Sequence, residues 1–472
     1  MPKITGMAFS YIPMNPKWFE PASKFVDSSF PAAVAKLGQL VKIPGIAWPS
    51  FDQGNLELSV EKVADEFRQL GFFDFVEIRR AARPSGDSGA PALVARKAGH
   101  PDAPHVLLYA HHDVQPPGDR SLWDTEPFEA TLKGDRLFGR GASDDKSGII
   151  THLTSLRAFI ELATEVRIGV TVFIEGEEEA GSESFPEFLR ANHADLAADL
   201  IVVADSGNWS EDVPALTSSL RGMVSQTFTL RTLDHALHSG MYGGPLPDAT
   251  TAMIRLLASL TDEKGNVAIL GLDSVSIDGP ELSDAEFTQV AGLLPGVERL
   301  GTKTVTQQIW GEPAVTVIGL DLPAVDVASN TAQPAVRAKI SLRLAPSQSP
   351  RSGLEALKDH LTRHKPFGAE LEFGRHETGP GYLAKDGWAA KLAHEAFSAA
   401  WPNPSVNMGI GGSIPFISQF AEAFPSAEIL VTGVEEPDSR AHSPNESQHL
   451  PTLKRAILAQ SLILLNGNDL VR

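Results

Sequence analysis

Adjacent acidic residues follow a predicted buried strand near the middle of the chain. The strand is the apolar, β-branched segment 168–174, and the acidic stretch is Glu175-Gly176-Glu177-Glu178-Glu179. Carboxylates crowded at the rim of a sheet repel one another, and a bound cation would relieve that repulsion. A single charge run is ordinarily a solvated loop. Here a metal-binding role is favoured because other predicted strands end in residues of the same kind.

Five side chains on predicted loops or strand ends are the candidate metal ligands. They are His111, Asp144, Glu179, Asp205 and His442. Each alone would more often be a solvated or capping residue, so the argument depends on the set. Imidazoles and carboxylates without sulfur suit Zn²⁺, with Mn²⁺ and Co²⁺ as alternatives. Because five ligands exceed the need of one catalytic ion, the set predicts a bridged site with two divalent ions ~3.5–4 Å apart.

The neighbours of these ligands suggest further roles. Asp113 lies two residues after His111 and could accept a hydrogen bond from the second imidazole nitrogen, which would fix the tautomer. Glu178 cannot easily share a metal with Glu179, because adjacent side chains on an extended backbone point apart. We therefore expect Glu178 to act as a general base toward water. Two further positions are interpreted as spacers that face elsewhere, His112 and Glu177.

The elements that must position these residues alternate between strands and helices. Predicted strands cover 75–78, 92–96, 105–109, 168–174 and 200–203. Predicted helices cover 33–41, 59–70, 187–191 and a segment that ends near 161. Because the candidate metal ligands follow the carboxyl ends of strands, the pattern predicts an α/β unit with a mostly parallel sheet.

The pattern changes after about residue 217. Strands are predicted over 224–230, 315–318, 336–344 and 370–374, with helices over 249–260 and 353–363. This order suggests a small α+β insert that resembles a split βαβ, ferredoxin-like unit. A helix over 388–399, a strand over 429–432 and a helix over 453–465 then restore the first pattern. We expect a discontinuous catalytic domain, 1–216 and 379–472, interrupted by a second domain over 217–378.

Composition restricts the class of protein. The 472 residues carry a net charge of −19 and form no basic stripe, which argues against a nucleic-acid partner. The absence of cysteine excludes disulfides and thiolate ligands. No apolar run reaches the ~18 residues of a membrane helix, and the first 30 residues lack the apolar core of a signal peptide. We therefore expect a cytoplasmic protein without a membrane partner.

Several motifs occur in an order that resembles one known family. They are His111-His112-Asp113-Val114-Gln115-Pro116, the segment 139–148, the segment 175–182, Asp205, Leu237-His238-Ser239-Gly240 with Gly243-Gly244, Ser341-Leu342-Arg343-Leu344, Gly411-Gly412-Ser413-Ile414-Pro415 and Ala441-His442-Ser443-Pro444-Asn445-Glu446. The chain resembles the M20 metallopeptidases, in their carnosinase-like dipeptidase branch. The resemblance extends over nearly the whole chain.

The resemblance implies roles for the candidate ligands. Asp144 would bridge two metal ions, with His111 and Asp205 completing one site and Glu179 and His442 completing the other. Glu178 would be the general base, and Asp113 would be the residue that orients the imidazole of His111. The Asp144–Asp145 peptide would be cis.

The resemblance also implies that the insert is a lid and dimerisation domain. His238 would reach the active site of a neighbouring subunit and help polarise the substrate carbonyl, and Arg343 would bind the substrate carboxylate. Gly412 and Ser413 would contact the bound peptide. The chain departs from the family at Gly409-Ile410, where carnosinase-like relatives tend to have Arg-Glu.

The sequence therefore predicts a homodimeric two-metal amidohydrolase that cleaves a small peptide, most simply a dipeptide. An N-acyl-amino-acid deacylase would use the same mechanism and differ only in what its pocket accepts at the amino end. An inactive metal-binding scaffold is the alternative from another class. It is disfavoured because Glu178 accompanies all the ligands.

Overall fold

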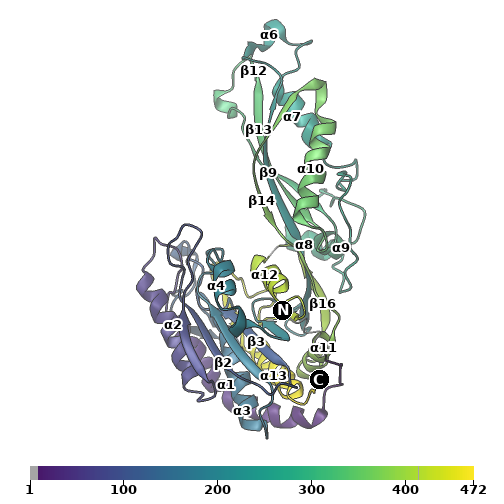
Figure 1. Cartoon of the computed structure of the whole chain (residues 1–472). Helices are drawn as coiled ribbons and strands as arrows, with labels where there is room; N and C mark the ends of the chain where they lie inside the picture. Colours follow the sequence, from purple (N-terminus) through teal and green to yellow (C-terminus); the bar gives the residue numbers. More distant parts are fainter. Residues whose placement is uncertain (1–8, 413, 472) are drawn as a thin grey trace. The chain divides into compact units, whose positions relative to one another are not determined.

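The computed structural model describes residues 9–412 and 414–471, and its contacts divide the chain into two compact units (Figure 1). The first unit contains the described residues up to Ser218, Ala384–Asn407 and the described residues from Gln419 onward. The second contains Ser219–Leu383 and the described residues of Met408–Ser418. The first unit is therefore built from three separate segments and the second from two.

A six-stranded sheet forms the centre of the first unit. Its strands, in spatial order, are β1 (Phe75–Arg79), β2 (Ala92–Lys97), β6 (Gly169–Glu175), β3 (His105–His111), β7 (Leu200–Val203) and β17 (Glu428–Val431). The pairs β6–β3, β3–β7 and β7–β17 are parallel, whereas β1–β2 and β2–β6 are antiparallel. The predicted α/β class with a mostly parallel sheet is confirmed.

Helices cover both faces of this sheet. One face packs against α1 (Phe19–Val41), α2 (Gln53–Arg68), α3 (Lys146–Leu162), α11 (Trp388–Ala400) and α13 (Leu450–Gly467). On the other face, Tyr109 and Phe173 contact aromatic side chains of α4 (Phe185–Ala191) and α12 (Pro415–Ala423). A short helix, α5 (His193–Leu196), follows α4. Strands with apolar residues on both faces are typical of a covered parallel sheet.

Two helices begin at least six residues earlier than the sequence pattern indicates. The helix predicted over 33–41 is the end of α1, which starts at Phe19 and continues through Pro31. Pro21 lies in the first turn of α1, where an absent N–H breaks no intrahelical hydrogen bond. The helix predicted over 59–70 begins at Gln53, because the Asp52 side chain caps its first turn.

Two short three-stranded sheets escaped prediction. One consists of β18 (Ser447–His449), β5 (Arg136–Phe138) and β4 (Thr131–Lys133). The other consists of β15 (Tyr382–Leu383), β8 (Ala215–Leu220) and β16 (Val406–Ile410). Most of these strands are too short to carry a readable alternation of apolar and polar residues.

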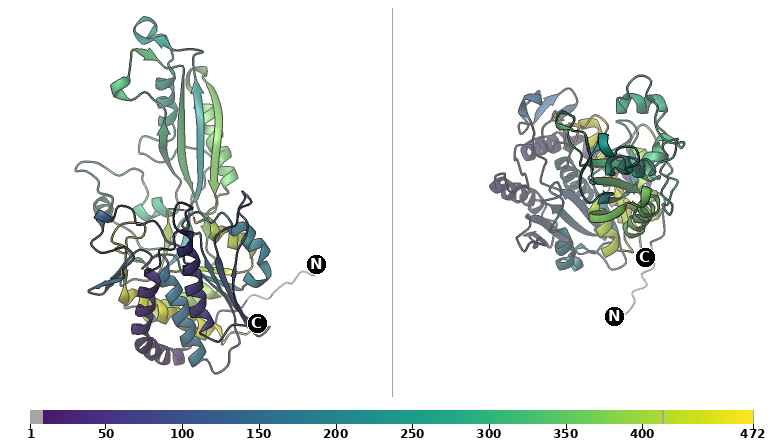
Figure 2. Two further views of the ribbon diagram at one scale, coloured as in Figure 1. Left: turned by 90° about the vertical axis from the view of Figure 1, so that its left-hand side faces the viewer. Right: turned by 90° about the horizontal axis from the view of Figure 1, so that it is seen from above.

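The second unit has a βαββαβ order. Its elements are β9 (Gly222–Arg231), α7 (Ala249–Ala258), β11 (Ala314–Leu320), β13 (Ala335–Leu344), α10 (Pro350–His364) and β14 (Glu370–Gly379). The strands form an antiparallel sheet in the order β11-β13-β9-β14, with α7 and α10 packed on its core face (Figure 2). This is the predicted ferredoxin-like arrangement.

Smaller elements interrupt that unit. They are β10 (Leu237–His238), α6 (Ser239–Tyr242), α8 (Asp284–Ala291), α9 (Val305–Trp310) and β12 (Thr331–Ala332). Strand β10 pairs with β12, so the segment that contains His238 is anchored to the segment just before β13.

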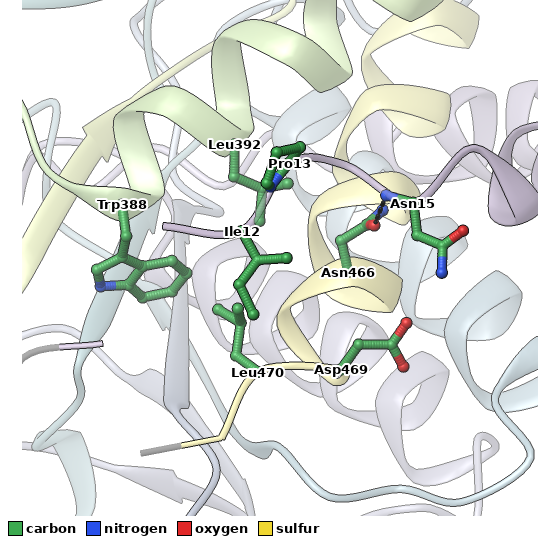
Figure 3. A pocket seen from close by; sticks show the side chains of 8 residues that line it. All are labelled: Ile12, Pro13, Asn15, Trp388, Leu392, Asn466, Asp469 and Leu470. Atoms are coloured by element: carbon green, nitrogen blue, oxygen red, sulfur yellow. Dashed lines mark hydrogen bonds between the residues drawn. The ribbon is translucent and has the colours of Figure 1, made fainter. Parts of the chain in front are cut away.

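The segment before α1 packs against α11 and α13. Ile12 and Pro13 lie over Trp388 and Leu392, and together they enclose a pocket of about 80 Å³ (Figure 3). The lining contains none of the candidate ligands. Within residues 9–412 and 414–471, no helix combines the length and apolar character needed to cross a bilayer.

Candidate active site

Three neighbouring parallel strands bring candidate ligands to one edge of the sheet. His111 is the last residue of β3, Glu179 follows the end of β6, and Asp205 lies two residues past β7. The register pairs His111 with Glu175, the last residue of β6, so these strands end at the same level. This is the edge at which parallel α/β sheets place their ligands.

Loops deliver the other two candidate ligands to the same place. Asp144 lies just before α3, and the Asp144–Asp145 peptide is cis as predicted. His442 lies in the connection between β17 and β18 and adopts a left-handed backbone conformation, with a φ of 62°.

The five side chains form two groups that share one carboxylate. The His111 Nε2 atom lies 2.9 Å from Asp144 Oδ1 and 3.9 Å from Asp205 Oδ1. The His442 Nε2 atom lies 2.9 Å from Asp144 Oδ2 and 3.1 Å from Glu179 Oε2. Within each group the candidate ligand atoms all lie within 4.8 Å of one another. The two oxygens of Asp144 therefore face different groups.

These separations fit divalent metal ions. Two ligand atoms ~2.1 Å from a tetrahedral ion are about 3.4 Å apart, close to the nitrogen–oxygen distances of 2.9–3.9 Å in the two groups. The donor set contains nitrogen and oxygen only. His111, Asp144 and Asp205 can hold one ion, and Asp144, Glu179 and His442 can hold a second.

Asp113 contacts both His111 and the turn that carries Glu178 and Glu179. The His111 Nδ1 atom lies 3.4 Å from Asp113 Oδ1 and 3.1 Å from the Asp113 carbonyl oxygen. The Asp113 carboxylate also accepts hydrogen bonds from the backbone N–H groups of Glu178 and Glu179, at 3.2 and 3.1 Å. Asp113 thus directs Nε2 of His111 toward Asp144 and holds the acidic turn.

The adjacent glutamates have different surroundings. The Glu179 carboxylate accepts hydrogen bonds from the backbone N–H of Gln115, at 3.1 Å, and from its side-chain amide, at 2.7 Å. Glu178 belongs to neither ligand group. Removal from water, together with the nearby Asp205 carboxylate, raises the pKa of Glu178 well above its usual value.

The charges of the cluster depend on one another. Burial raises the pKa of Asp205 to about 7. Hydrogen bonds to Asp144 and Glu179 raise the pKa of His442 to about 11. A protonated His442 therefore supplies positive charge among the carboxylates, and a metal ion would have to displace that proton to bind.

The two positions interpreted as spacers do face elsewhere. The buried Glu177 carboxylate accepts hydrogen bonds from the Ala90 and Ser184 backbone N–H groups, at 3.0 and 2.6 Å, and pairs with Arg83. His112 is buried, and its Nε2 lies 2.8 Å from the Pro91 carbonyl oxygen. Glu177 thereby stabilises the turn that carries Glu178 and Glu179.

Two carboxylates near the cluster were missed by sequence reasoning. Burial and the charges of Asp144 and Asp205 raise the pKa of Glu435 well above its usual value. Glu435 follows β17, so the rule that selected Asp205 after β7 would have found it. Glu446 is fully buried and contacts the loop of Asp144. Glu446 lies far from any predicted strand end, and its place in the motif 441–446 was the only signal in the sequence.

The remaining candidate residues belong to the second unit. His238 is exposed at the end of β10, and its Nδ1 atom accepts a hydrogen bond from the Gly240 N–H at 3.2 Å. Arg343 lies in β13, between Met223 of β9 and Ala314 of β11 in the register. Gly412 is described, whereas Ser413 lies outside the described residues.

Packing in the second unit explains why position 409 holds a glycine instead of the arginine common in carnosinase-like relatives. A Cβ atom at position 409 would lie 2.4 Å from Cγ of Trp310, so no side chain fits there. The neighbouring Gly411 carbonyl accepts a hydrogen bond from the buried Arg221 side chain at 3.1 Å. The segment before Gly412 is thus held by Arg221 and covered by Trp310.

Comparison with known proteins shows the family of this chain. The chain belongs to peptidase family M20/M25/M40, whose model matches residues 107–466. It is 33% identical over 389 residues to a cysteinylglycine-S-conjugate dipeptidase of Corynebacterium striatum, covering 80% of this chain and 84% of the relative. It is 26% identical over 409 residues to the mouse (Mus musculus) beta-Ala-His dipeptidase, covering 81% and 82%. The crystal structure of human carnosine dipeptidase 1 superposes with a TM-score of 0.71 at 22% identity, covering 97% of this chain and 100% of that one.

Proposed function

We propose that this M20-family protein is a metal-dependent dipeptidase that uses two divalent ions. The observation that carries the proposal is Asp144, whose two oxygens face two different groups of potential ligands. A carboxylate in that position can bridge two ions, an arrangement suited to hydrolysis. The names of the similar proteins, which are dipeptidases, support a dipeptide as the substrate.

The roles of the residues follow from their positions. Bound ions supply Lewis acidity toward the scissile carbonyl and make water more acidic. Glu178, which belongs to neither ligand group, accepts the proton of the attacking water and passes it to the leaving amine. Asp113 keeps the His111 ring oriented and fixes the backbone of Glu178. The family resemblance, rather than position, assigns Arg343 to the carboxylate of the substrate and Gly412 and Ser413 to contact with the bound peptide.

We assign Zn²⁺ to both positions, with Mn²⁺ and Co²⁺ as the alternatives. Two imidazoles and three carboxylates are the donors, and sulfur is absent from the whole chain. Nitrogen and oxygen ligands at these separations suit zinc. A cytoplasmic location remains the prediction made from the sequence.

We further propose that the second unit, predicted over 217–378, is a lid and dimerisation domain. Its strand β11 lies at the edge of the sheet and exposes apolar side chains, including Val317 at 43% and Ile318 at 53%. An exposed apolar edge strand favours pairing with a second copy. His238, exposed in the same unit, would then act in the active site of the partner subunit.

The test is hydrolysis of matched substrates by the purified protein with its metal content measured. We expect two ions per chain, cleavage of dipeptides, and loss of activity on chelation that added Zn²⁺, Mn²⁺ or Co²⁺ restores. Faster cleavage of N-acetyl amino acids than of the corresponding dipeptides would reassign the enzyme as a deacylase. Two bound ions with no hydrolysis of either class would indicate a metal-binding scaffold.

A further inference from the structure

A buried ion pair lies directly behind the candidate metal ligands. The Arg140 Nη1 atom donates a hydrogen bond of 2.6 Å to Glu446 Oε2, and both residues are at most 1% exposed. Neither belongs to the two ligand groups. A buried ion pair is costly to desolvate and is often no more stable than apolar packing, so its presence beside the site requires another explanation.

The Glu446 carboxylate organises the backbone that leads to Asp144. Its Oε2 atom accepts a hydrogen bond from the Gly141 N–H at 3.1 Å. Its Oε1 atom accepts hydrogen bonds from the N–H groups of Ser143 and Asp144, at 3.0 and 3.1 Å. One side chain therefore satisfies three backbone donors in the turn that presents Asp144 to both ligand groups.

Arg140 extends this connection to two other ligand-bearing loops. Its Nη2 atom donates to the carbonyl oxygens of Pro116, at 3.4 Å, and Ser443, at 3.3 Å. Pro116 lies in the loop that follows His111, and Ser443 adjoins His442. The ion pair thus links the loops of three of the five candidate ligands.

We propose that Arg140 and Glu446 are positioning residues that hold Asp144 in its bridging orientation between the loops of His111 and His442. The inference rests on the proposed two-metal site. The backbone hydrogen bonds that Glu446 accepts fix the Cα position of Asp144, and the hydrogen bonds that Arg140 donates to carbonyl oxygens fix the loops on either side. Loss of such outer contacts typically weakens metal binding 10–100-fold.

The competing explanation is that the pair only stabilises the fold. The chain provides a matched control in Glu66, which is 4% exposed and pairs with Lys36 between α1 and α2. Glu66 lies on a helix rather than in a ligand-bearing loop. Replacing Glu446 with alanine leaves the buried Arg140 without its carboxylate, and replacing Glu66 leaves the half-buried Lys36 without one. Both variants should therefore lower thermal stability.

The experiment compares metal affinity in Glu446→Ala, Glu66→Ala and the unaltered protein. Each metal-free protein is titrated with Co²⁺ against a chelating indicator, and its melting temperature and Co²⁺ absorption spectrum are recorded. We expect Glu446→Ala to bind Co²⁺ at least ~10-fold more weakly, with an altered spectrum. Glu66→Ala should match the unaltered protein in affinity and spectrum despite a lowered melting temperature.

Equal affinity in Glu446→Ala and Glu66→Ala would overturn the positioning role. If Glu446→Ala does not fold, Glu446→Gln decides, because its one carbonyl oxygen can satisfy only part of the network. A several-fold weaker affinity in Glu446→Gln supports the proposal, and unchanged affinity refutes it. Should the unaltered protein bind no Co²⁺, the two-metal site itself is wrong. Two ions bound equally by all variants would instead refute only the role of Glu446.

Discussion

Glu178 and Glu179 are adjacent, and replacing each with glutamine should produce different defects. Glutamine keeps the size of the side chain and removes its charge and its ability to accept a proton. Glu179 belongs to the group with Asp144 and His442, whereas Glu178 belongs to neither group. Glu178→Gln should therefore retain both ions and lose catalysis, and Glu179→Gln should lose an ion.

The expected magnitudes follow from this geometry. Loss of a general base typically reduces kcat by ~10²–10⁴, which raises the barrier by about 2.7–5.4 kcal/mol. Without its carboxylate at position 179, the second group keeps only Asp144 and His442, while His111, Asp144 and Asp205 are untouched. The metal content of Glu179→Gln should accordingly fall from two ions toward one per chain.

Elemental analysis after gel filtration and steady-state hydrolysis of one dipeptide measure both effects. The metal-loaded variants are compared with the unaltered protein at the same total Zn²⁺. Equal metal loss in the two variants would refute the separation of roles. So would a Glu178→Gln variant that keeps both ions and nearly full kcat.

Three further outcomes are expected. Removal of metal should lower the melting temperature, because ions at 100 times their Kd add about 2.7 kcal/mol per site to the free energy of unfolding. An unchanged melting temperature after verified removal would count against the site. Inactive His238→Ala and Glu178→Gln subunits, mixed to form heterodimers, should regain part of the activity; verified heterodimers without activity would exclude action in trans. Burial lowers the pKa of His152 to about 4, so below pH ~6.5 the unfolded state takes up a proton that the folded state does not. Stability should therefore fall by ~3 kcal/mol between pH 6.5 and 4 from this group alone, and urea unfolding of His152→Gln should show a correspondingly flatter pH dependence.

The sequence was informative where local pattern and chemistry agree. Parallel strands can be recognised in the sequence by their continuous apolar runs, and β7 has the predicted bounds of 200–203. Because such strands end at one edge, the convergence of His111, Glu179 and Asp205 could be inferred without coordinates. The place of Asp144 between the two groups was implied only by family resemblance, since loop conformation decides where that side chain lies.

The unpredicted features depend on tertiary contacts. The start of α1 was hidden by Pro21, which the first turn tolerates, and by Pro31, which lies inside the helix. The bonds of Glu446 to the loop of Asp144 join residues about 300 positions apart, a relation that no local pattern contains. The exclusion of a side chain at position 409 likewise depends on Trp310, from a distant helix.

The order in which the chain is made has a consequence for assembly of the first unit. Strand β17 and helix α13 complete its sheet and core, yet both follow the whole inserted unit in the sequence. On the ribosome, more than 160 intervening residues are made after the amino-terminal segment of the first unit and before β17, the last strand of its sheet, and His442. During that time the apolar faces of α1 and α3 lack their partner α13. We therefore expect nascent chains to depend on chaperones until α13 has been made.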